Sequence, residues 1–333
     1  MLIQIFFGLS LIFSTNALSK NDYKKYFKDY QRPSSIPHPA DNKYTTERED
    51  LGKTLFFDPR LSGSDWISCG TCHNPTLSWG DGLPKGVGHG MKAVGRRTPT
   101  ILNLAWGELM FWDGRSDSLE DQALGPIEAA GEMNLPIKEL LVKLNGIPGY
   151  KDLFEKAYPG KGITKETIGK AIALYERTIV SGEAPFDRWL KGDETAISES
   201  AKKGFEIFNK KGECAVCHSG WRFTDDGFHD IGIAGDDKGR GSVLDVESLN
   251  YTFKTPTLRN VDHRAPYMHD GSEKTLEEVV DLYNKGGRVR RSTISDNVKV
   301  LGLNEKEKAD LVAFMRTLTS KDKAVELPMM PRK

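Results

Sequence analysis

Cys69-Gly70-Thr71-Cys72-His73 is the stretch around which this 333-residue chain is arranged, and Cys214-Ala215-Val216-Cys217-His218 repeats its pattern. C-x-x-C-H is the attachment signature of a c-type haem. Two thiols on one turn add to the vinyl groups of the porphyrin, and the following His lies under the iron as its axial ligand. The two motifs use all 4 cysteines. The sequence therefore predicts two covalent haems c, one held by Cys69, Cys72 and His73 and the other by Cys214, Cys217 and His218.

Three other uses of these cysteines agree less well with the pattern. A zinc site built from both pairs would join segments 145 positions apart, far beyond the spacing of a compact zinc module. A thioredoxin-like redox pair does not require a His directly after the second Cys. A structural disulfide within each pair would leave both histidines unexplained. These remain the alternatives to haem.

Length and charge limit the class of protein. The chain is long enough for two ordinary domains. Lys plus Arg and Asp plus Glu are both 47, so the net charge is zero. This balance does not suggest nucleic acid and fits small-molecule or protein partners.

The N-terminus is typical of an exported protein. Residues 1–17 resemble a secretory signal peptide, with an almost wholly apolar run from Leu2 to Phe13 and small residues near Ala17. A basic segment before the run is missing. The run is short for a bilayer span, so an uncleaved anchor is the alternative. Since c-type haem is attached outside the bacterial cytoplasm, we expect a periplasmic protein.

The rest of the chain divides by composition and period. Residues 18–46 are polar and show no sustained period, which predicts a leader lying on the surface. Helical periodicity begins near Thr45, with Leu51, Leu55 and Phe56 on one face. Further helices are predicted over 140–144 and 165–180. Residues 183–198 carry Gly, Pro and charges without a period, which predicts a linker.

Beyond that linker the pattern starts again. Gly52-x-x-Leu55-Phe56, ahead of the first haem motif, is matched by Gly204-x-x-Ile207-Phe208 ahead of the second. Tyr175-x-Arg177-Thr178 is matched near the C-terminus by Phe314-x-Arg316-Thr317. Chance similarity of amphipathic helices is the alternative, but the duplicated haem motif argues against it. The prediction is a mostly α protein of two tandem cytochrome c-like haem domains, over 47–182 and 199–322, with a tail over 323–333.

The first half carries more motifs than an electron carrier needs. Among them are Arg96-Arg97-Thr98-Pro99-Thr100, Phe111-Trp112-Asp113-Gly114-Arg115, Leu119-Glu120-Asp121-Gln122 and Gly131-Glu132-Met133, joined later by Ala265-Pro266-Tyr267-Met268-His269-Asp270-Gly271. With these motifs the chain resembles, over roughly residues 50–320, the bacterial di-haem cytochrome c peroxidase family, which includes the MauG-type enzymes.

The resemblance implies roles for three residues beside the first haem. Cleaving peroxide heterolytically requires moving a proton from one oxygen to the other, and a carboxylate above an open iron can do this. By resemblance that carboxylate is Glu132, and Gln122 places the peroxide by hydrogen bonding. Trp112 matches the tryptophan that the family keeps between the two haems for electron transfer. Without the resemblance, Glu132 and Gln122 would be read as surface groups and Trp112 as core.

The resemblance also assigns sixth ligands. His89 matches the histidine that caps the first haem in resting peroxidases, and its glycine-rich setting would let it move; an exposed loop histidine is the alternative. The better-known peroxidases place Met fourteen residues after the motif histidine, here His269, but position 283 is Tyr, as in MauG-type members. A phenolate lowers the haem potential, whereas a thioether raises it. The alternatives to Tyr283 are Met268 and an open iron.

Calcium is a further departure from the family. Relatives commonly hold Ca²⁺ between the haems through an Asn at the position of Arg97. A cation has replaced a carboxamide ligand, which puts calcium in doubt, although the carbonyls of Arg264 and Pro266 could still contribute.

Three functions follow as hypotheses. The leading one is a periplasmic peroxidase that reduces hydrogen peroxide with electrons from a small cytochrome c or a cupredoxin, and His89 favours it. The second is a MauG-like enzyme that oxidises residues of a partner protein, and Tyr283 favours it. The third is a di-haem electron carrier without catalysis. A basic run formed by Lys285, Arg288, Arg290 and Arg291 predicts either a docking site for an acidic partner or a solvated loop.

Overall fold

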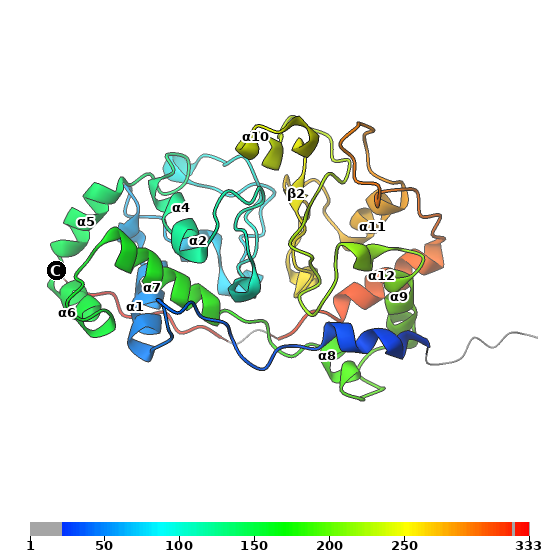
Figure 1. The fold of residues 1–333 in the computed structure, drawn as a ribbon, viewed down its shortest axis with the longest axis horizontal. Coiled ribbons are helices and arrows are strands. Elements are labelled where there is room, and N and C mark those ends of the chain that lie inside the picture. Colours follow the sequence, from blue (N-terminus) through cyan, green and yellow to red (C-terminus); the bar gives the residue numbers. More distant parts are fainter. Residues whose placement is uncertain (1–21, 322–323, 333) are drawn as a thin grey trace, which may run out of the picture.

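Two crossed helix pairs organise the molecule, one in each half of the chain. The computed structural model describes residues 22–321 and 324–332, so the predicted signal peptide lies outside the described residues. In the first half α1 (Thr46–Phe57) packs against α7 (Lys165–Thr178), and in the second α9 (Glu199–Asn209) packs against α12 (Glu305–Arg316). Figure 1 shows α1 and α7 in the left half of the molecule and α9 and α12 in the right half. The predicted mostly α architecture of two tandem domains is confirmed.

Both crossings depend on a glycine. An added Cβ at Gly52 would lie 2.0 Å from the carbonyl oxygen of Ala171, and one at Gly204 would lie 1.9 Å from that of Asp310. These distances are far below contact, so each helix pair can approach this closely only because the side chain is absent. The repeated glycine of the sequence therefore marks the same helix crossing in both halves.

The remaining elements are shorter, and some of them line the two cavities described below. The other helices are α2 (Cys69–Cys72), α3 (Leu119–Gln122), α4 (Gly125–Glu128), α5 (Ile137–Asn145), α6 (Pro148–Ala157), α8 (Pro185–Leu190), α10 (Arg240–Leu244) and α11 (Leu276–Asn284). Single turns of 3₁₀ helix lie at Pro59–Leu61, Pro75–Leu77, His89–Met91, Leu104–Trp106, Cys214–Val216, Glu247–Leu249 and Val261–His263, and a longer one (η1) spans Asp22–Tyr30. Strands β1 (Phe228–His229) and β2 (Phe253–Lys254) pair antiparallel.

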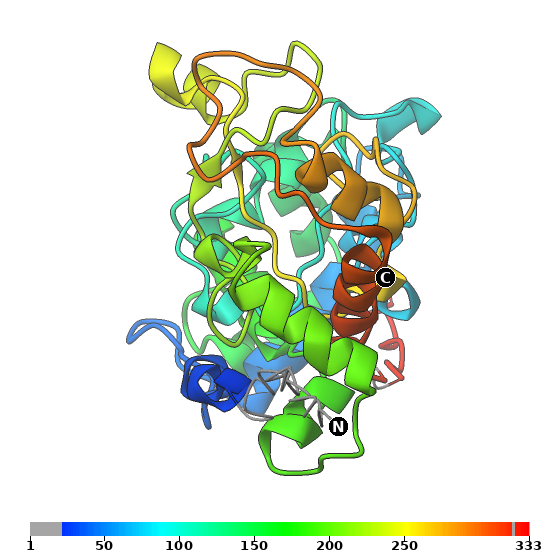
Figure 2. The ribbon, with the colours of Figure 1, turned by 90° about the vertical axis from the view of Figure 1, so that its right-hand side faces the viewer.

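Each half has its own hydrophobic core. The first includes Leu51, Leu55, Phe56, Leu140, Leu144, Tyr150, Phe154, Ile168 and Ile172. The second is rich in aromatic rings and includes Phe186, Trp189, Phe205, Phe208, Phe223 and Phe314. Figure 2 looks onto this second half, with α9 and α12 near the viewer. Separate cores explain how two similar units fold in tandem.

Segment 183–198, predicted as a linker, is instead partly helical. Residues 185–190 form α8, and its Phe186 and Trp189 are fully buried in the second core. The sequence did not show this helix, because a helix of 6 residues is too short to show a period. Its stability comes from aromatic packing, with the Trp189 ring 5.4 Å from that of Phe205.

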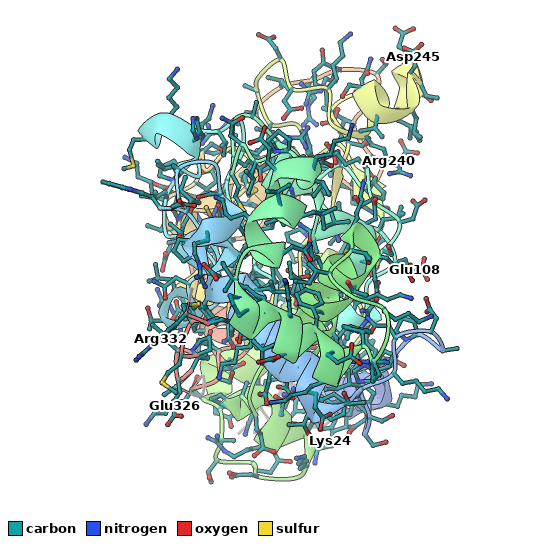
Figure 3. All side chains as sticks on the ribbon, turned by 90° about the vertical axis from the view of Figure 1, so that its left-hand side faces the viewer. Lys24, Glu108, Arg240, Asp245, Glu326 and Arg332 are labelled. Carbon is teal, nitrogen blue, oxygen red and sulfur yellow. The ribbon has the colours of Figure 1, made fainter. Side chains whose placement is uncertain are left out.

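The two ends of the described chain each pack on the opposite half. The leader forms η1, whose Tyr30 is buried in the second core and donates a hydrogen bond to Asn209 Oδ1 at 2.8 Å. The C-terminal tail returns to the first half, where Val325 packs on the core and the carbonyl of Pro331 accepts a hydrogen bond from Arg60. Figure 3 looks onto the first half and shows Glu326 and Arg332 of this tail. Within the described ranges, no helix is both long and apolar enough to cross a membrane.

Candidate active site

The first C-x-x-C-H motif forms a single helical turn, α2, which begins after Ser68. The Ser68 backbone N–H donates to Thr71 Oγ1 at 3.0 Å, which stabilises the start of the turn. His73 ends it, and its Nδ1 lies 3.1 Å from the carbonyl oxygen of Trp79. A carbonyl can only accept, so Nδ1 carries the proton and Nε2 keeps the lone pair that an iron ligand needs.

The second motif has the same arrangement. His218 Nδ1 lies 2.9 Å from the carbonyl oxygen of Phe223. The backbone N–H groups of His73 and His218 both donate, at 2.8 Å, to the carbonyl of the first cysteine of their motif. Burial lowers the pKa of both imidazoles, which favours the neutral, ligating form. Both histidines are therefore oriented as metal ligands.

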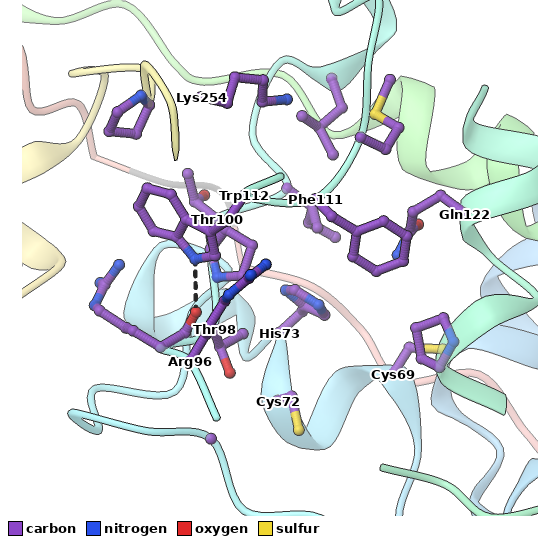
Figure 4. Close-up of a pocket in the computed structure, with 18 of the residues that line it drawn as sticks. Cys69, Cys72, His73, Arg96, Thr98, Thr100, Phe111, Trp112, Gln122 and Lys254 are labelled. Carbon is purple, nitrogen blue, oxygen red and sulfur yellow. Dashed lines mark hydrogen bonds between the residues drawn. The ribbon is translucent and has the colours of Figure 1, made fainter. Parts of the chain in front are cut away.

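The first motif faces a cavity of about 490 Å³. Its lining includes Cys69, Cys72, His73, Phe111, Trp112, Gln122, Glu132 and Glu176. Figure 4 shows the attachment residues along one side, with Phe111, Trp112 and Gln122 across from them. The volume is that of a ligand pocket, and the buried Gln122 Oε1 has no hydrogen-bond partner among the described residues. Two thiols, an oriented imidazole and an unpaired amide fit a haem with room for a small ligand.

The structure brings Gln122 and Glu132 to this same cavity from different turns. Gln122 ends α3, whose N-cap Ser118 accepts from Asp121 N–H at 3.2 Å, and Glu132 follows α4. Burial raises the pKa of Glu132, and Arg115 partly opposes the shift. A carboxyl group with a raised pKa holds a proton more firmly, which suits a group that takes and returns a proton.

Trp112 lies in the wall that the first cavity shares with a second one. It lines both cavities and is 8% exposed. Its indole Nε1 donates to the Arg97 carbonyl oxygen at 2.8 Å (Figure 4). The ring is thus held in one orientation between the two attachment motifs.

The second cavity contains both predicted sixth ligands. Tyr283, from α11, and Met268 line it together with Cys214, Cys217 and His218. Burial raises the pKa of Tyr283. A phenolate there would need a nearby cation, and ferric iron is one. Both side chains therefore line the cavity that faces the second motif, and both stay predicted sixth ligands.

His89 is not among the residues that line the first cavity, although its neighbours Val87 and Gly88 are. Its ring is half-buried, and Nδ1 has no hydrogen-bond partner among the described residues. The His89 backbone N–H donates to the Gly131 carbonyl at 3.3 Å, so this loop packs against the turn that carries Glu132. A capping role for His89 stays a prediction.

Sequence reasoning missed three charged side chains near the cavities. Glu176 is 4% exposed and lines the first; Lys254 lines both; His229 lines the second. His229 Nε2 lies 2.8 Å from Asp225 Oδ2, and this hydrogen bond raises the pKa of His229 to about 10. The repeat offered a signal for Glu176 alone, because its register pairs Glu176 with Met315, which lines the second cavity.

The basic run is partly used inside the fold. Arg291 makes a bidentate ion pair with Asp230, at 2.7 and 2.8 Å, and Arg288 pairs with Glu273 at 2.5 Å. Asp230 and the Glu273 side chain are almost fully buried. Arg291 therefore holds the loop to the domain, and Arg288, whose side chain is still 48% exposed, adds one ion pair to it.

Comparison with known proteins adds three findings. The family model for di-haem cytochrome c peroxidase matches residues 46–195, and that for cytochrome c matches residues 201–319. The chain is 49% identical to methylamine utilization protein MauG of Methylorubrum extorquens, over 96% of this chain and 91% of that protein. It is 34% identical to cytochrome c551 peroxidase of Pseudomonas aeruginosa, over 90% and 86%.

A solved structure resembles this fold over most of its length. The crystal structure of a MauG-like protein associated with microbial copper homeostasis superposes with a TM-score of 0.81 at 29% identity, covering 88% of this chain and 96% of that one.

Proposed function

Because the chain belongs to the di-haem cytochrome c peroxidase family, which includes the MauG-type enzymes, we propose that it is a MauG-like oxidoreductase. In this proposal it is exported to the periplasm, carries two covalent haems c, and uses peroxide to oxidise residues of a partner protein.

Tyr283 is the observation that carries this choice. It lies in the second cavity, at the position where the better-known peroxidases have a thioether ligand. A phenolate stabilises ferric and more oxidised iron, so a haem with this ligand is a poor electron store and a good store of oxidising power. The greater identity to a MauG protein, 49% against 34% for the peroxidase, supports the same choice.

The chain's own residues would divide the work at the first cavity. Cys69, Cys72 and His73 would hold a haem c there, and this group would supply the iron chemistry that splits peroxide. Gln122 would orient the peroxide, since its buried amide oxygen is unpaired. Glu132 would take the proton from the near oxygen and return it to the departing one, as its raised pKa allows. The reduction of one peroxide to two waters would take two electrons from the partner protein, together with two protons released by the oxidised residues or taken from solvent.

Trp112 would link the two cavities. It lines both, and its single hydrogen-bonded orientation would keep one aromatic ring between the haems. Electrons withdrawn from the partner protein could then pass through Trp112 between the two haem cavities.

Peroxide reduction with a small cytochrome c or a cupredoxin as donor is the second candidate. Met268, in the same cavity as Tyr283, favours it. If Met268 were the sixth ligand, the second haem would have the high potential that an electron store requires.

The deciding experiment treats the purified ferric holoprotein with one equivalent of peroxide and follows optical and electron paramagnetic resonance spectra without a reductant. We expect a long-lived loss of both ferric signals in the wild type. In Tyr283→Met this state should disappear, and peroxide turnover with a reduced small cytochrome c should rise.

Tyr267→Phe is the matched control, because Tyr267 lines the same cavity while its hydroxyl donates to the Val261 carbonyl at 3.1 Å. It should behave as the wild type. A ferric protein that is inert until one electron is added, and then reduces peroxide rapidly, would reject the MauG-like assignment in favour of the second candidate.

A further inference from the structure

The wall between the two cavities contains a buried guanidinium group. Arg97 is 5% exposed and lines both cavities. Its backbone N–H donates to the His269 carbonyl at 2.8 Å, and its own carbonyl accepts from Trp112 Nε1. The backbone of Arg97 therefore ties the first half of the chain to the second and holds the bridging tryptophan.

The charged end of Arg97 makes one contact across the same boundary. Its Nη2 donates to the carbonyl oxygen of Arg264. Its Nε is buried without a partner among the described residues, and burial lowers the pKa of the guanidinium. A buried charge without an anion is costly.

These residues do not fit a calcium ion. Ca²⁺ takes 6–8 oxygen ligands. The family likeness expects a carboxamide at position 97 and a carbonyl at Arg264, yet here a guanidinium occupies the first position and donates to the second. Lys254 lies in the same wall, and its Nζ donates to the Leu109 carbonyl at 2.6 Å. The positive charge of the Arg97 guanidinium would repel a divalent cation.

We propose that the Arg97 guanidinium replaces the calcium ion that relatives hold between their haems, so that this protein needs no divalent cation there. The side chain supplies the positive charge and the contact to the Arg264 carbonyl that join the two halves. This inference rests on the two-haem family, and it holds whichever oxidation the enzyme performs.

The first test is metal analysis of the holoprotein as purified. Inductively coupled plasma mass spectrometry should find two irons and far less than one calcium per chain. Prolonged dialysis against EGTA should leave both haem spectra and the melting temperature unchanged. One calcium per two irons, removed by EGTA with a change in the haem spectra, would overturn the proposal.

The second test restores the carboxamide. Arg97→Asn, after EGTA treatment, should show altered haem spectra and a lower melting temperature, and Ca²⁺ should restore both where Na⁺ of equal ionic strength does not. Arg97→Lys keeps a cation and should stay insensitive to calcium. Arg188→Asn, which removes a cation from an exposed face of α8, controls for the loss of charge alone.

Two outcomes of the second test contradict the proposal. One is an Arg97→Asn protein that holds both haems with wild-type spectra and melting temperature in EGTA. The other is an Arg97→Lys protein that needs calcium. If Arg97→Asn does not fold, the metal content of the wild type and the behaviour of Arg97→Lys still decide.

Discussion

Glu132 and Glu176 both line the first cavity, and their surroundings give the two carboxyl groups different properties. Glu132 is half-buried and lies near Arg115, which limits the rise of its pKa. Glu176, on α7, is almost fully buried, and its Oε2 has no partner among the described residues. Burial raises the pKa of Glu176 to about 8, so it is mostly protonated at neutral pH.

Glu132→Gln should slow the reaction of the ferric protein with peroxide by about 10²–10⁴-fold, the usual contribution of a positioned acid–base group. The measurement is stopped-flow absorbance of the first haem under excess peroxide. Glu139→Gln, an exposed change on α5, should leave the rate unchanged. A wild-type rate in Glu132→Gln would exclude the carboxyl group as the proton carrier.

Glu176 should make stability depend on pH. Its folded pKa is raised, so between about pH 4.5 and 8 the folded protein keeps a proton that the unfolded chain loses. The folded state then binds more protons, and stability falls as pH rises through this window and levels off above it.

Glu176→Gln removes this dependence. We expect its melting temperature to fall less between pH 5 and pH 9 than that of the wild-type holoprotein, measured by circular dichroism. Glu128→Gln, an exposed control, should follow the wild type. Parallel curves for Glu176→Gln and the wild type would mean that Glu176 is ionised in the loaded cavity.

At the scale of elements, the crossed pairs α1–α7 and α9–α12 hold the two halves in cytochrome c-like form. Both α7 and α12 begin with a capping box, from Thr164 and Asn304, so each closing helix starts at a defined residue. The close approach of the two helices in each pair then depends on the glycine at their crossing.

Gly204→Ala should destabilise the second half, because its Cβ would lie 1.9 Å from the Asp310 carbonyl oxygen and 2.7 Å from Phe314 Cβ. Overpacking of this kind costs about 1–3 kcal/mol or more. Thermal unfolding followed at the haem absorbance would register the loss. Lys203→Ala, exposed on the same helix, should change the melting temperature little, and equal melting of the two variants would contradict the close crossing.

At the scale of the whole molecule, the chain ends bind its two halves together. The leader packs on the second core through Tyr30, and the tail packs on the first through Val325 and Pro331. Pro331 lies over the start of α6, where a Cβ on Gly149 would meet its ring at 2.8 Å. The leader precedes the first half but packs on the second, and the tail follows the second half but packs on the first.

Removing residues 324–333 should loosen the first half, by on the order of 1–2 kcal/mol for a lost hydrogen bond and a small buried apolar area. Hydrogen exchange followed by mass spectrometry should speed up in α6 and stay unchanged in α9. Removing the leader through residue 31 should give the opposite pattern. Uniform exchange after tail removal would show that the tail stabilises no particular half.

The structure also differs from expectation at this scale. The tail was predicted only as an end of the chain, and 183–198 only as a linker, yet both pack on cores. Neither segment has the length or period that marks an amphipathic element. Their order comes from partners outside each segment, as in the contacts of Phe186 with Phe314 and of Arg60 with Pro331, and a local pattern does not encode such contacts.

The sequence by itself determined the two attachment motifs, the tandem repeat and the helices from Thr46 and Lys165, because each depends on neighbours within one or two turns. It also supplied Glu132, Gln122, Trp112 and Tyr283 as candidates, through family likeness. Only the tertiary structure brought these side chains to two cavities with a shared wall, oriented His73 and His218, and buried Arg97 and Glu176. Burial, proton affinity and the orientation of a ligand depend on atoms that meet only when the two halves and both chain ends have packed together.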